Sequence, residues 1–139
     1  MRAQRGEGTV DLTGNAGDFK LAQDASRLAE SAALLLKAAG VRGELSGDGQ
    51  TDDMTRRELA HAAIRAEEGM DVADVTLTKG QAETLSTDMS VAAAVMGVFA
   101  TAHEVAGNSD AANAFRYRAT HFADLHAPVE HDLFPEGRR

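Results

Sequence analysis

The sequence predicts an all-α protein, an antiparallel four-helix bundle with a central, nearly all-apolar third helix. Hydrophobic residues make up 43% of the chain but aromatic residues only 4%, so the core must consist of Ala, Leu, Val and Met, which suit close-packed helices. Four segments repeat apolar residues at helical spacing. Residues 91–106 are apolar or small on nearly every side, as in a helix that is central in its fold or shared with a second subunit.

The chain of 139 residues suits one domain, which we expect to span residues 18–127. Residues 1–17 are glycine-rich without periodicity and predict a flexible N-terminal arm, and residues 128–139 predict a C-terminal tail. The first helix is expected over residues 19–39, with Asp18 as its N-cap. Its predicted buried stripe is Leu21, Ala25, Leu28, Ala32, Leu35 and Ala39.

A glycine-rich loop is expected over residues 40–50, followed by a second helix that has Thr51 as its N-cap and runs to about Gly69. The apolar stripe of this second helix is Leu59, Ala62, Ala63, Ala66 and Met70. Residues 71–77 suggest an extended linker that packs on the core.

A capping box marks the start of the third helix, because Thr78 and Gln81 match the pattern S/T-x-x-E/Q. This helix is expected to run to Ala106. A fourth helix follows and is predicted to stop at Pro128, because the residue before a proline disfavours the helical conformation.

Charge and composition narrow the possible partners. The net charge is −8, and residues 44–90 hold 11 acidic against 4 basic residues, which counts against nucleic acid binding. The acidic middle is most simply a solvated face, and alternatively a docking surface for a basic partner. The chain has no cysteine, no recognisable signal peptide, and an apolar run at 91–106 too short to span a bilayer. We therefore expect a cytoplasmic protein without a membrane partner.

Two pairs of residues are candidates for a metal or polar site. Glu58 and His61 form a Glu-x-x-His pair, the spacing that helical bundles use to place a carboxylate and an imidazole on one divalent metal ion. Both fall on the polar side of their helix, so a solvated surface pair is the simpler interpretation. His103 and His126 lie on apolar stripes and are candidates for buried histidines.

These patterns favour a non-catalytic protein that acts by protein–protein interaction in a regulatory, adaptor or assembly role. We expect a homodimer, with an unidentified protein as a further partner and no cofactor. The expected interface residues lie on the third helix: Met89, Val91, Val95, Met96, Val98 and Phe99. Gly97 on the same helix is expected to permit close helix packing. The alternative is a helical bundle, with or without enzymatic activity, that binds a metal ion or small ligand at Glu58 and His61 or at His103.

Overall fold

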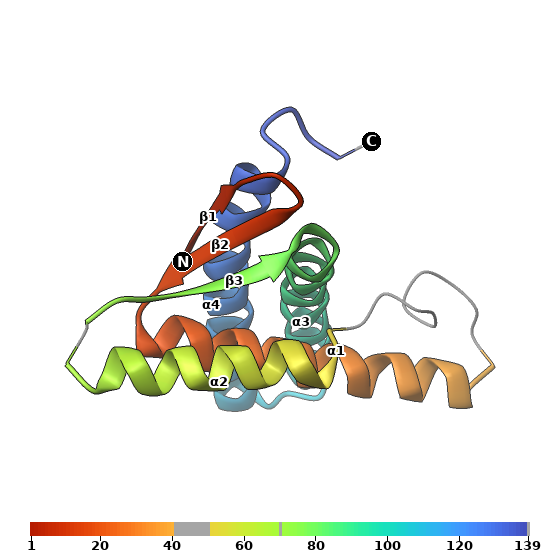
Figure 1. The fold of residues 1–139 in the computed structure, drawn as a ribbon. Coiled ribbons are helices and arrows are strands. Elements are labelled where there is room, and N and C mark those ends of the chain that lie inside the picture. Colours follow the sequence, from red (N-terminus) through yellow and green to blue (C-terminus); the bar gives the residue numbers. More distant parts are fainter. Residues whose placement is uncertain (41–50, 70, 139) are drawn as a thin grey trace.

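The computed structural model describes residues 1–40, 51–69 and 71–138, so the loop expected at 41–50 lies outside the described residues. Within these ranges, four helices and three strands follow in the order shown in Figure 1: β1 (Arg2–Arg5), β2 (Thr9–Gly14), α1 (Ala16–Ala38), α2 (Asp53–Glu67), β3 (Ala73–Thr78), α3 (Lys79–Val105) and α4 (Ser109–Leu133). The four expected helices are present. The all-α class is wrong in one respect, because the chain also contains an antiparallel sheet.

The three-stranded sheet includes residues that the sequence predicted to be a flexible arm. β2 is the central strand and pairs antiparallel with both β1 and β3. Val10 and Leu12 of β2 pair with Leu77 and Val75 of β3, and all four side chains are buried. Polar residues alternate with them along β2, a period of two that is typical of a half-buried strand.

The helices form two antiparallel pairs that cross, rather than four helices aligned along one axis. In Figure 1, α3 and α4 stand side by side as a hairpin, and α1 and α2 lie across them. The sheet packs at one end of this arrangement, with β1 against α4 and β3 against α2. The core therefore lies where the two helical pairs and the sheet meet.

α1 buries a different stripe from the predicted one. It begins at Ala16 with Asn15 as its N-cap, and Asp18 completes a capping box instead of serving as the N-cap itself. Its buried residues are Phe19, Ala22, Ala25, Ser26, Ala29 and Ala33. The small alanines let α2 and α3 approach closely, which leaves Leu35 exposed and Leu21 and Leu28 at the edge of the core.

The start of α3 agrees with the prediction, whereas the end of α4 does not. The capping box at Thr78 and Gln81 is confirmed as the start of α3. The helix α4, in contrast, continues past Pro128 to Leu133, so the predicted stop is wrong. A proline within a helix removes one backbone hydrogen bond. The buried side chains of Val129 and Leu133 offset that loss by holding the last turns of α4 against the core.

Candidate functional site

The outer face of α3 is the candidate interaction surface. This face comprises the residues in the second half of α3, from Val91 to Val105, that lie within about 60° of Val98 at about 100° per residue: Val91, Ala94, Val95, Val98, Thr101, Ala102 and Val105. Val98 is 66% exposed and Val105 is 84% exposed, whereas Val91 and Val95 are half-buried. No Asp, Glu, Lys or Arg occurs between Asp88 and Glu104. The result is an uncharged, largely apolar strip of surface along the second half of the helix.

The expected interface residues divide between this surface and the core. Met89 is 0% exposed and Met96 is 4% exposed, so both are core residues that no partner can reach while the chain is folded. Phe99 is exposed and lies at the edge of the outer face, with its ring centroid 5.5 Å from that of Phe115 on α4. The reachable part of the predicted interface is therefore the valines and Phe99.

The composition of α3 also fits a helix that crosses a membrane. Among the described residues it is the one helix long and apolar enough to cross a membrane, with a mean hydropathy of 1.4 over 18 residues, of which 39% are buried in the fold. The opposite face of α3, with Leu85, Met89 and Ala92, lies in the core. A central helix of a globular fold has the same composition, so this is weak evidence for a membrane span.

Two histidines were candidates for burial, and the structure shows both half-buried. The ring of His103 stacks on Phe115 with centroids 5.2 Å apart, near the turn between α3 and α4. His126 places Nε2 3.3 Å from Glu130 Oε2. Each histidine thus has its own local partner.

A polar cluster around Glu130 joins α3, α4 and the C-terminal segment. The Ser86 hydroxyl donates to Glu130 Oε2 at 2.6 Å, and the Arg138 guanidinium pairs with both carboxylate oxygens. The hydrogen bond from Arg138 lowers the pKa of Glu130 to about 2, with further help from Ser86 and His126, although partial burial opposes the shift.

This cluster contains the residue types of a catalytic triad, Ser86, His126 and Glu130, but its hydrogen bonds connect them in a different order. In a Ser–His–acid triad the serine hydroxyl gives its proton to the imidazole. Here Ser86 donates to Glu130 instead, and His126 contacts the same carboxylate oxygen. The hydroxyl of Ser86 therefore faces a carboxylate whose low pKa makes it a weak base, and not the imidazole, so the cluster serves to connect elements of the fold. Sequence reasoning did not connect Ser86 or Arg138 with Glu130, because it placed Glu130 in a tail beyond the helices.

Asp88 is a buried carboxylate that attaches the start of α2 to α3. It is 3% exposed, and its Oδ2 accepts hydrogen bonds from the Thr51 backbone N–H at 2.9 Å and the Thr51 hydroxyl at 2.6 Å. Burial raises the pKa of Asp88, although both hydrogen bonds act to lower it. The predicted cap residue Thr51 is therefore an anchor, and Asp52 is the N-cap of α2.

The predicted metal pair gains no further ligand in the described part of the chain. Glu58 and His61 are both exposed on α2. Within residues 1–40, 51–69 and 71–138, no group of three or more His, Asp or Glu side chains is placed to hold a metal ion. The metal-binding alternative stays a prediction.

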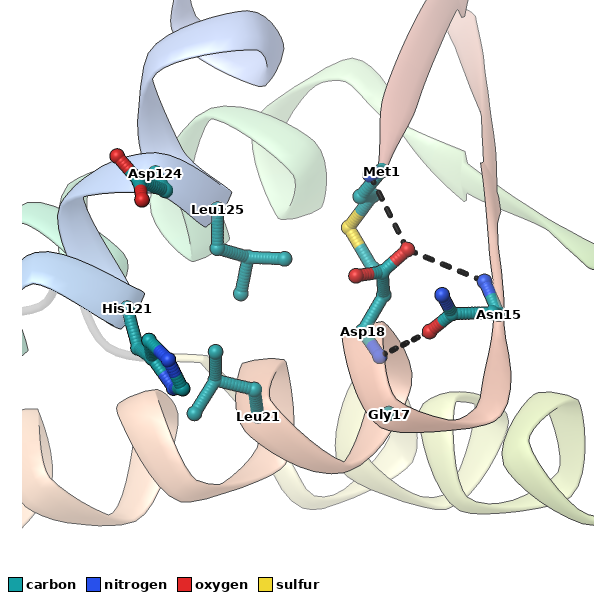
Figure 2. Close-up of a pocket in the computed structure, with 8 residues that line it drawn as sticks. All are labelled: Met1, Asn15, Gly17, Asp18, Leu21, His121, Asp124 and Leu125. Carbon is teal, nitrogen blue, oxygen red and sulfur yellow. Dashed lines mark hydrogen bonds and ion pairs between the residues drawn. The ribbon is translucent and has the colours of Figure 1, made fainter. Parts of the chain in front are cut away.

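An open cavity of about 400 Å³ lies between the start of α1 and the middle of α4 (Figure 2). Its polar side chains include Asp18, His121 and Asp124. The Asp18 carboxylate accepts the Asn15 backbone N–H at 3.1 Å as part of the capping box. In Figure 2 the carboxylate of Asp124 points away from Asp18, so these groups do not converge on one ligand position.

Comparison with protein-family models, curated proteins and solved structures finds no match. The functional interpretation therefore depends on the surfaces and side chains of this chain alone.

Proposed function

We propose that the chain acts by protein–protein interaction and forms a homodimer through the outer face of α3. The observation that carries this proposal is the uncharged strip from Val91 to Val105, exposed on a helix whose opposite face is in the core. Contiguous exposed apolar surface is uncommon on monomeric proteins and marks interaction sites.

The charge of the chain favours a second copy as the occupant of this face. Two chains of net charge −8 repel each other wherever charged surfaces meet. A two-fold interface brings the same patch of both subunits together, so each residue meets residues of its own surface. The outer face of α3 carries no charge, and it therefore meets its own copy without like-charge repulsion.

The shape of the face supports the same arrangement. Ala94 and Ala102 lie beside Val98, and these short side chains let a second helix come close. The exposed aromatic ring of Phe99 adds apolar area at the edge. An interface of this kind leaves the acidic surface of each subunit free for a further partner in an adaptor or assembly role.

Val98→Glu provides the direct test, because it places a charge at the centre of the face on both subunits. Multi-angle light scattering at high micromolar concentration is expected to show a dimer for the unmodified chain and a monomer for Val98→Glu. Val72→Glu is the matched control, since Val72 is also an exposed valine but lies just before β3. It is expected to remain a dimer, with thermal melting confirming that both variants fold.

Three results would overturn the proposal. The first is a monomer for the unmodified chain at high micromolar concentration. The second is an intact dimer for Val98→Glu, and the third is dissociation of the dimer by Val72→Glu to the same extent as by Val98→Glu. Flotation of a monomeric chain with lipid vesicles would instead identify a membrane as the occupant of this face.

A further inference from the structure

A cavity of about 250 Å³ between α1 and α2 is lined by three arginines. Arg27 comes from α1, Arg56 and Arg57 come from α2, and Gln23 and Asp53 complete the polar lining. Three guanidinium groups at one cavity stand out in a chain whose net charge is −8.

Arg56 is fixed in place by its own partners. Its guanidinium pairs with Glu30 and with Asp53 and donates to the Thr51 carbonyl oxygen at 3.1 Å, and its side chain is only 17% exposed. The Gln23 side chain donates to the Arg56 carbonyl oxygen at 3.3 Å. Arg56 and Gln23 therefore connect the two helices at one side of the cavity.

Arg27 and Arg57 are different, because both are exposed and neither pairs with a carboxylate anywhere in the described ranges. Arg56 already satisfies Glu30 and Asp53, so the charges of Arg27 and Arg57 remain available at the cavity. A planar guanidinium matches the geometry of phosphate and carboxylate oxygens and binds them with charge-assisted hydrogen bonds.

We propose that this cavity binds a phosphate group, either as inorganic phosphate or as a phosphate monoester, between Arg27 and Arg57. The guanidinium groups of Arg27 and Arg57, which pair with no carboxylate of the described residues, match a phosphate group, which carries a charge of about −1.5 to −2 at neutral pH. Asp53 lines the same cavity and opposes an anion, although its exposed carboxylate is screened by solvent. This site is independent of the outer face of α3 and of the proposed dimer.

The test is an NMR titration of the ¹⁵N-labelled chain with inorganic phosphate at constant ionic strength. Saturable shifts are expected at the amides of α1 and α2 around the cavity. The double variant Arg27→Gln/Arg57→Gln is expected to weaken binding about tenfold or more, because it removes two charge-assisted contacts. The matched control is Arg5→Gln/Lys79→Gln, which removes the same charge from two residues that line a different cavity. This control is expected to bind phosphate as the unmodified chain does.

Asp53→Asn gives a prediction of opposite sign. Removing the competing carboxylate is expected to tighten phosphate binding, while circular dichroism checks that α2 still forms. Titration with O-phosphoserine separates the two sources of the ligand, since a site for monoesters binds it at least as tightly as inorganic phosphate.

The proposal is overturned if sodium chloride at equal ionic strength produces the same shifts, because the effect is then screening by an adventitious ion only. It is also overturned if both double variants lose binding equally, or if acetate binds as tightly as phosphate. Dimer formation by the unmodified chain is measured separately, so failure of this site and failure of the dimer are distinguishable.

Discussion

Glu130 shows how a single carboxylate holds three parts of the chain together. It accepts from Ser86 on α3, lies beside His126 one turn away on α4, and pairs with Arg138 beyond the end of α4. The guanidinium of Arg138 also lies 4.4 Å from the centroid of the Phe134 ring. Since these contacts favour the ionised carboxylate, they lower its pKa and connect its charge to the stability of the fold.

Replacing Glu130 tests this connection. In the folded chain its pKa is about 2, below the ordinary value of 4.5, so the folded state binds fewer protons than the unfolded state between these values. The stabilisation is therefore present above about pH 5 and is lost as the pH falls toward about 2. Glu130→Gln is expected to lower the free energy of unfolding at pH 7 by about 1–3 kcal/mol, and to flatten its acid dependence.

Urea denaturation at a series of pH values from 7 to about 2 measures both effects. Glu136→Gln is the control, because Glu136 is an exposed carboxylate on the same C-terminal segment. Equal losses in the two variants would show that the cluster around Glu130 does not stabilise the fold.

At the scale of the element, the packing of α3 around Gly97 differs from the predicted packing. The sequence suggested that Gly97 permits close helix approach, but a Cβ built at this position meets no atom within 4 Å. Gly97→Ala is therefore expected to raise the free energy of unfolding by about 0.5–1 kcal/mol, because alanine loses less backbone entropy in a helix. Thermal or urea denaturation at low concentration measures the gain.

Gly107→Ala is the contrasting variant for this prediction. Gly107 follows the end of α3 with a φ of +83°, a conformation that strains a residue with a Cβ, so this change is expected to destabilise the chain. A loss of stability in Gly97→Ala would instead place Gly97 against another helix.

The helices were predictable to different degrees, for physical reasons. Thr78 and Gln81 satisfy the first backbone groups of α3 locally, so sequence alone locates its start. Pro128 is also a local signal, but the burial of Val129 and Leu133 outweighs it. The buried stripe of α1 depends on which helices lie against it. Alanine and leucine are distributed so evenly around this helix that the sequence alone does not show which face is buried.

At the scale of the whole molecule, residues 1–14 belong to the domain rather than to an arm. Leu12 on β2 is fully buried, whereas Thr13 beside it is exposed. Leu12→Ala is expected to lower the free energy of unfolding by about 2–5 kcal/mol, as other buried leucines do. Thr13→Ala is expected to change it by no more than about 0.5 kcal/mol. Urea denaturation of the two variants compares them, and a flexible arm would make both substitutions neutral.

Candidate sites within one helix can be found from the sequence, whereas sites shared between helices depend on tertiary packing. The valines on the outer face of α3 repeat within one helix, so the sequence included them in the expected interface, but it did not separate them from Met89 and Met96 in the core. The cavity with Arg27 and Arg57 was not predictable, because its residues come from two helices whose relative placement depends on tertiary packing. Glu58 and His61 form a motif within one helix, which needs ligands from other helices to become a metal site, and the described residues place none beside it.

The pairing of β2 with β3, and of Arg2 with Asp132, has a consequence for how the chain folds during synthesis. Arg2 and Asp132 are separated by 130 positions in the sequence, and their side chains meet in a bidentate ion pair. At about 5–20 residues per second, a ribosome needs on the order of ten seconds to add α4 after β2 has emerged. A two-stranded hairpin is at best marginally stable alone. We therefore expect β1 and β2 to become stable only when β3 and α4 are present to pack against them. The packing of β1 against α4 therefore forms only after α4 has been synthesised, later than the pairing of β2 with β3.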